Sequence, residues 1–194
     1  MATPFRSGSA LTSRMLNTHS EVGMICDKLK YFSFCYNRYT PLTNTNIKKM
    51  LNDVEKRLSG RYDITIDVDE CMDQVLKTPK SEASIYSTLL QNIFKKSNKT
   101  IIGEVEGLSW TKIPIFLEMF PDSKALLIIR DLRDVVVSFK KLTIAPANDY
   151  LIALFNVIDA MDHFIEYQNN FPNRFHGIRF EDLKNNPKNE MKNI

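Results

Sequence analysis

The sequence predicts an α/β fold with a central, mainly parallel sheet that is flanked by helices and carries a helical insertion. A short apolar run at 125–129 has the length and composition of a buried strand, and residues 100–107 are a second strand candidate. The segment between them has helical periodicity, and Pro114 can occupy its first turn. The three segments form a β-α-β unit, for which a right-handed crossover and parallel strands are expected.

The rest of the amino-terminal half is predicted to be mostly helical. Helical spacing of apolar residues and capping residues predict helices at 9–18, 47–58, 67–76 and 81–94. The helix at 47–58 is predicted to end at Ser59 and Gly60, with a short strand at 61–66 after it. Residues 21–43 are rich in aromatic side chains and are interpreted as core or as the wall of a pocket.

The carboxyl-terminal half continues the α/β pattern. Residues 151–165 carry a long apolar stripe at helical spacing, and Pro172 ends that helix. A strand at 174–180 follows, and a last helix begins after it. Because so little chain follows this strand, we expect a domain that is incomplete at its carboxyl terminus and short at its amino terminus.

Length and composition predict one domain spanning residues 1–194. The chain has 43% hydrophobic and 25% charged residues, and its net charge of +3 is spread along the sequence. This distribution favours anionic small molecules over nucleic acid as partners. The sequence has neither an apolar run of membrane-spanning length nor a signal-peptide core, so a cytoplasmic protein without a membrane partner is expected.

Charged side chains cluster where the strand at 125–129 ends. Arg130 and Asp131 follow the apolar run directly, and Asp131 can cap a helix that carries Asp134 and Ser138. Open α/β sheets bind ligands at the carboxyl ends of their strands. A guanidinium there, with a serine hydroxyl in the next helix, suits a phosphate monoester; alternatively, Arg130 pairs with Asp131 or Asp134 in a surface network.

A second candidate anion site precedes the first predicted helix. Arg6, Ser7, Gly8 and Ser9 form a tight loop where helix amides, two hydroxyls and a cation would converge. An ordinary cap and turn would use the same residue types. The loop lacks the second glycine and the lysine of the Walker A pattern, which disfavours a magnesium-dependent nucleotide hydrolase or kinase.

Two carboxylates lie near the end of the strand predicted at 100–107. Glu104 and Glu106 are suited to acid/base chemistry, or they are solvated loop charges.

Three stretches, taken in order, resemble the motifs of one known family. They are Arg-Ser-Gly-Ser at 6–9, Arg-Asp-Leu-Arg-Asp at 130–134 with Ser138 after it, and Arg-Phe-Glu-Asp-Leu at 179–183 followed by Pro187. They are similar to R-S-G-T-T, R-D-P-R-D-x-x-x-S and Y-E-D-L of the sulfotransferase family. The resemblance covers nearly the whole chain.

The resemblance implies a P-loop-like three-layer fold and sulfuryl transfer from 3′-phosphoadenosine 5′-phosphosulfate (PAPS), without a metal, to a hydroxyl or amine of a small-molecule or glycan acceptor. It also implies that the loop Arg6–Leu11 binds the 5′-phosphosulfate and that Arg6 steadies the transferring group. Arg130 and Ser138 would bind the 3′-phosphate. Phe180 replaces a tyrosine that lies near the adenine in some relatives.

The same resemblance supplies candidates for the catalytic base. His19-Ser20-Glu21-Val22 is similar to an H-P-D/E-V segment of tyrosylprotein sulfotransferases, and the acidic position after that segment falls on Asp27. Asp27 is therefore the first candidate base and Glu104 the second. For either residue, an ordinary surface carboxylate is the alternative.

The chain departs from the family pattern at several positions. Ala10 replaces a threonine of the loop, Leu132 replaces a proline, and Gly103-Glu104-Val105 lacks the lysine of a related G-D-K pattern. These departures prompt one alternative to an active sulfotransferase, a non-catalytic nucleotide-binding remnant of the fold. A less favoured alternative is a small-molecule kinase that uses the loop for ATP, against which the loop sequence argues.

Overall fold

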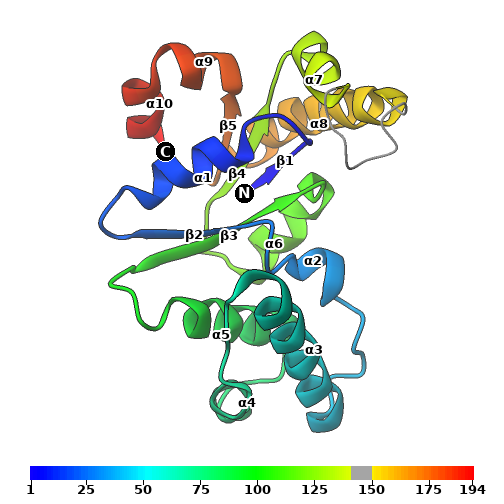
Figure 1. Ribbon diagram of the computed structural model, residues 1–194, viewed down its shortest axis with the longest axis vertical. Coiled ribbons are helices and arrows are strands. Elements are labelled where there is room, and N and C mark those ends of the chain that lie inside the picture. Colours follow the sequence, from blue (N-terminus) through cyan, green and yellow to red (C-terminus); the bar gives the residue numbers. More distant parts are fainter. Residues whose placement is uncertain (141–149) are drawn as a thin grey trace. The chain divides into compact units, whose positions relative to one another are not determined.

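The computed structural model describes residues 1–140 and 150–194. These residues divide into two compact units, the first formed by Met1–Leu16 and Val105–Ile194 and the second by Asn17–Glu104 (Figure 1). The sheet has the strand order β2-β3-β1-β4-β5. Its strands are β1 (Ala2–Thr3), β2 (Val22–Cys26), β3 (Ile101–Gly107), β4 (Ala125–Ile129) and β5 (Phe175–Arg179).

The central pairs of the sheet are parallel, as the sequence predicts. Strand β1 pairs with β3 and β4, and β4 pairs with β5 over its full length, with Leu127 opposite Gly177. The carboxyl ends of β1 and β4 therefore lie side by side. This register brings the two predicted anion-binding segments to the same edge of the sheet.

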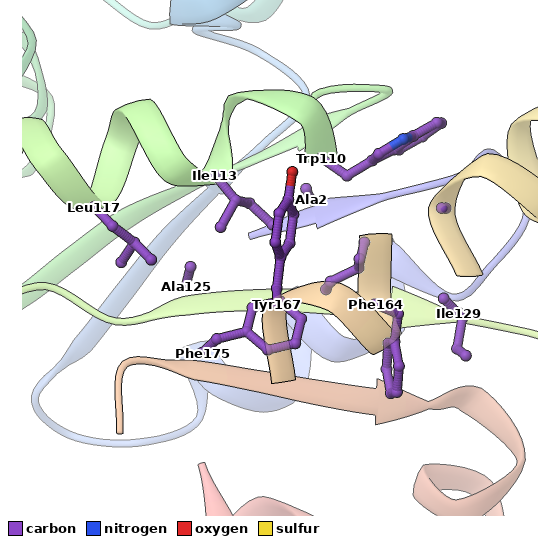
Figure 2. Packing of buried hydrophobic residues seen from close by; sticks show 11 residues of the cluster. Ala2, Trp110, Ile113, Leu117, Ala125, Ile129, Phe164, Tyr167 and Phe175 are labelled. Carbon is purple, nitrogen blue, oxygen red and sulfur yellow. The ribbon is translucent and has the colours of Figure 1, made fainter. Parts of the chain in front are cut away.

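In the first unit, helices cover both faces of the sheet. These helices are α1 (Ser9–Asn17), α6 (Ile113–Met119), α7 (Leu132–Phe139), α8 (Tyr150–Asn170), α9 (Phe180–Asn185) and α10 (Pro187–Asn193). Ala125, Leu127 and Ile129 of β4 face a cluster that includes Leu117 of α6 and Phe164 of α8 (Figure 2). The alternate residue Ile128 packs with Leu183 of α9, and Met15 of α1 lies against that second cluster. This alternation gives the three-layer arrangement of an α/β fold.

The second unit contains the helical insertion. Its helices are α2 (Tyr31–Phe34), α3 (Asn44–Tyr62), α4 (Val68–Leu76) and α5 (Glu82–Phe94). Thr43, Asp67 and Ser81 cap α3, α4 and α5 with their side-chain oxygens. Buried apolar residues at helical spacing on α3, including Ile47, Leu51 and Leu58, face the core of the unit.

Two local predictions in this unit are wrong. Helix α3 continues through Ser59 and Gly60 to Tyr62, and Asp63 caps it in the left-handed conformation, with φ of 54°. The strand expected at 61–66 is absent because α3 occupies its first two residues and the rest forms no strand. Strand β2 lies in the aromatic-rich segment 21–43, for which the sequence predicted no strand.

Candidate anion-binding site

The loop between β1 and α1 contains two residues in a left-handed backbone conformation, which residues other than glycine rarely adopt. Arg6 has φ of 66° and Gly8 has φ of 99°, both in the left-handed region. A Cβ atom on Gly8 would lie 2.3 Å from Cδ2 of Phe180. Glycine is therefore required at this position both for its conformation and for the close approach of the Phe180 ring.

Two buried polar atoms in this region have no hydrogen-bond partner among the described residues. They are Oγ of Ser7, a residue that is 0% exposed, and Nε of Arg130. Buried polar groups in folded proteins nearly always have a partner in the protein, in ordered water or in a ligand. Both atoms can donate a hydrogen bond and both residues lie just before a helix, so an anion is one kind of partner that would suit them.

Arg130 lies directly after β4 and reaches the loop. Its Nη1 donates a hydrogen bond to the carbonyl oxygen of Arg6 at 3.0 Å, and its guanidinium lies over the Phe180 ring, 4.7 Å from the ring centroid. Its Nη2 also contacts Asp134 at 3.4 Å, so the ion pair considered from the sequence is present as well. The guanidinium is thus held in place by three partners.

Ser138 completes the cluster from α7. Its Oγ accepts a hydrogen bond from Nε of Arg6 at 2.9 Å. The helix that carries it, α7, is capped by Asp131, whose side chain accepts from the backbone N–H of Arg133, as the sequence predicts. Side-chain and backbone hydrogen bonds from Arg133 lower the pKa of Asp131 to about 2.

Glu181 has a role that the sequence did not assign. Its carboxylate accepts a hydrogen bond from the backbone N–H of Asp131 at 2.9 Å, and so it fixes the turn between β4 and α7. The turn carries Arg130, and Phe180 contacts the Arg130 guanidinium. Phe180 and Glu181, which are adjacent in the 179–183 motif, therefore both support the arrangement around Arg130.

The structure brings together most of the residues predicted to bind a nucleotide. Arg6, Ser7, Gly8, Arg130, Ser138 and Phe180 are joined by the contacts above, and Ser9, Ala10 and Leu11 form the first turn of α1. The side chains of Ala10 and Leu11 are hydrocarbon and cannot bind an anion, so these residues can contribute backbone amides only.

The two candidate bases, Asp27 and Glu104, belong to the second unit. Asp27 follows β2 with φ of 52°, is about one-third exposed, and forms an ion pair with Lys30 at 3.5 Å. Glu104 is only 4% exposed, and its carboxylate accepts hydrogen bonds from the backbone N–H groups of Lys30 and Tyr31 and from the hydroxyl of Tyr86.

The alternative of solvated loop charges for Glu104 and Glu106 is wrong, because both lie within β3 and are buried. Glu104 is likewise not an ordinary surface carboxylate. Its hydrogen bonds to backbone N–H groups compensate for the loss of water around the carboxylate.

Neither a metal cluster nor a membrane span is found in the part of the chain that the structure describes. No group of three or more His, Cys, Asp and Glu side chains there is arranged to hold a metal ion. No helix within 1–140 or 150–194 is long and apolar enough to cross a bilayer.

Comparisons with known proteins bear on the family and the fold of the chain. Residues 4–194 match the model of a family described as the sulfotransferase family. A crystal structure of a sulfotransferase from Alicyclobacillus acidocaldarius is similar in fold, with a TM-score of 0.54 and 14% sequence identity. The similarity covers 99% of this chain and 77% of that one. No curated protein sequence matches the chain.

Proposed function

This chain belongs to the sulfotransferase family, and we propose that it moves a sulfuryl group from PAPS to a hydroxyl or amine of a small-molecule or glycan acceptor. The observation that carries the proposal is the convergence of Arg6, Arg130 and Ser138 at the ends of β1 and β4. The unpartnered Oγ of Ser7 and Nε of Arg130 support it, because an anionic ligand would satisfy both.

The loop Arg6–Leu11 is proposed to bind the 5′-phosphosulfate. The first amides of α1 have no partner within the helix, and the helix dipole favours negative charge at this end. The hydroxyls of Ser7 and Ser9 add donors, and Gly8 lets the backbone approach the phosphate. The Arg6 guanidinium uses Nε for Ser138, and its other two nitrogens are proposed to bind the phosphosulfate.

The 3′-phosphate is assigned to Arg130 and Ser138. A guanidinium can bind a phosphate through two parallel hydrogen bonds, and a serine hydroxyl adds a third donor. Phe180 holds the Arg130 guanidinium against its ring face, which fixes the direction of the donors. Phe180 thus takes part in the nucleotide site through its contact with Arg130, and an edge of its ring is proposed to face the adenine.

In the proposed reaction, the acceptor oxygen or nitrogen forms a bond to sulfur while the bond from sulfur to the 5′-phosphate oxygen breaks. Asp27 takes the acceptor proton as general base. Arg6 and the α1 amides stabilise the negative charge that develops on the leaving phosphate. Because fixed cations and amides can supply this stabilisation, the proposal includes no metal ion.

The first test is binding of adenosine 3′,5′-bisphosphate, the product nucleotide, measured by calorimetry. We expect the native protein to bind it and Arg130→Ala to bind at least about tenfold more weakly, because a charge-assisted pair is lost. Arg133→Ala is the matched control, since this exposed arginine lies three residues away and contacts Asp131 instead. Equal binding by native protein and Arg130→Ala would contradict the proposed site.

The second test is transfer of labelled sulfate from PAPS to a panel of phenols, sugars and amines. Transfer to any member supports the proposed activity. Nucleotide binding without transfer to any of them would favour the non-catalytic remnant, the reading prompted by Ala10 in the loop.

A further inference from the structure

The segment that carries Asp27 has an unusual backbone and is held firmly. Asp27 and Lys30 both have left-handed φ angles, of 52° and 48°, and Leu29 between them is fully buried. Two left-handed non-glycine residues within four positions are costly, so other contacts must hold this conformation in place. Two charged side chains from separate elements of the second unit provide such contacts.

Arg57 holds the segment by its carbonyl groups. From α3, its Nη1 donates to the carbonyl oxygen of Lys28 at 2.7 Å, and its Nη2 donates to that of Leu29. The guanidinium also lies over the Phe34 ring, 4.5 Å from the ring centroid. The planar group therefore spans two consecutive peptide units, which a lysine ammonium could not match in geometry.

Glu104 holds the next two residues by their amide groups. From β3, its carboxylate accepts from the backbone N–H of Lys30 and, at 3.3 Å, from that of Tyr31. Tyr86 donates to the same carboxylate at 3.1 Å, and its ring stacks on that of Tyr31 with 4.3 Å between centroids. Tyr86 therefore holds the Glu104 carboxylate in place, and the carboxylate in turn holds the backbone at Lys30 and Tyr31.

We propose that Arg57 and Glu104 are positioning residues for Asp27. One holds the carbonyls and the other the amides of the four residues that follow it, so the Asp27 backbone is set before any acceptor binds. A general base must be held within a fraction of an ångström of its working position. The inference rests on the proposed function, in which Asp27 takes the acceptor proton, and it assigns Glu104 a structural part in place of the proton transfer.

The test is a double-mutant cycle on transfer rates, using labelled PAPS and an acceptor on which the native protein is active. Arg57→Ala is expected to lower kcat by about 10- to 100-fold in the native background, because the base loses its alignment. In an Asp27→Asn background the same change is expected to alter the single-turnover rate less than about twofold, since the group it aligns is gone. Arg61→Ala, one turn further along α3 and exposed, is the matched control and should leave both rates unchanged.

If Arg57 only stabilised the fold, Arg57→Ala would lower the transfer rate by the same factor in the native and the Asp27→Asn backgrounds. That result would overturn the inference. Binding of adenosine 3′,5′-bisphosphate should be unchanged by Arg57→Ala, because the ligands proposed for that nucleotide lie in the first unit. Glu104→Gln, with hydrogen exchange followed at the Lys30 and Tyr31 amides, is the second variant, and it should speed exchange there while the α3 amides stay protected.

Failure of the proposed function has its own signature. If the native protein transfers to no acceptor, the proposed activity fails and the positioning role fails with it. If Asp27→Asn keeps the native rate, the assignment of Asp27 as base fails. If Asp27→Asn is slow but Arg57→Ala acts independently of it, only the positioning role fails.

Discussion

Nε of Arg6 donates a hydrogen bond to Oγ of Ser138 at 2.9 Å, although 132 positions separate the two residues in the sequence. The bond is made because β1 and β4 are neighbours in the sheet, so the loop after one strand meets the helix after the other. It joins a residue assigned to the 5′-phosphosulfate with one assigned to the 3′-phosphate. The two ends of the proposed nucleotide site are therefore linked directly by protein side chains.

Removal of the Ser138 hydroxyl should weaken binding selectively. Ser138→Ala is expected to reduce affinity for adenosine 3′,5′-bisphosphate by about tenfold, the effect of one hydrogen bond to a charged group. Affinity for adenosine 5′-phosphate should change little, because that nucleotide has no 3′-phosphate. Calorimetry with both nucleotides checks this, with Ser59→Ala on α3 as the control. A similar loss for both ligands would mean that Ser138 acts on the loop through Arg6.

Substitution of Gly8 should damage both stability and binding. Gly8→Ala places a Cβ atom 2.3 Å from the Phe180 ring in a backbone with φ of 99°. We expect the free energy of unfolding to fall by about 1–3 kcal/mol, as measured by urea denaturation. In a Phe180→Ala background, Gly8→Ala should lower the free energy of unfolding by a smaller amount, because the steric clash is gone and only the cost of the positive φ remains.

The matched control for Gly8 is Gly60, which lies inside α3 with nothing within 4 Å of its Cβ position. Gly60→Ala should raise the free energy of unfolding by about 0.5–1 kcal/mol, because alanine loses less backbone entropy in a helix. A loss at Gly60 equal to that at Gly8 would contradict the steric argument.

The charge of Asp131 should stabilise the fold in a defined pH range. Its pKa is lowered to about 2 by hydrogen bonds from Arg133, whereas an aspartate in an unfolded chain titrates near pH ~4. The contribution is therefore fully present above pH ~4 and is lost as the pH falls toward about 2. Asp131→Asn keeps a side-chain oxygen for the cap but removes the charge.

Urea midpoints of native protein and Asp131→Asn should accordingly differ near neutral pH and converge in acid. Asp122→Asn, in the exposed turn before β4, is the control and should show no such convergence. A difference in urea midpoint that grows as the pH falls would contradict a lowered pKa of Asp131 in the folded protein.

The clustering of Arg6, Arg130 and Ser138 could be predicted from the sequence because its signals are local. A short loop with Gly8 before a helix, an arginine after an apolar run, and Asp131 as a cap each depend on a few neighbouring residues. The parallel pairing that brings them together follows from the β-α-β rule. The family motifs then placed Ser138 and the 179–183 stretch in the same site.

The features that were missed depend on distant contacts. Arg57 is half-buried at the margin of the buried face of α3, and nothing near it in the sequence shows that two carbonyls from the 27–30 segment will meet it. From the sequence alone Glu104 could be a solvated carboxylate. Its burial becomes clear only from its hydrogen bonds to the Tyr86 hydroxyl and the Tyr31 amide. Such partners are known only once the elements have been packed.

Helix α8 gives the sharpest test of this distinction. The predicted stripe contains both Phe155 and Phe164, but Phe155 is 65% exposed and Phe164 is 9% exposed. The Phe164 ring packs so closely over Gly177 of β5 that a Cβ atom on Gly177 would lie 2.3 Å from the ring. It also meets the Phe175 ring edge to face, with 6.1 Å between the ring centroids.

Phe164→Ala should therefore lower the free energy of unfolding by about 3–5 kcal/mol. Phe155→Ala on the same helix should change it by less than about 0.5 kcal/mol. Urea denaturation of the two variants checks this, and equal losses would mean that the exposed face of α8 is packed against something in solution.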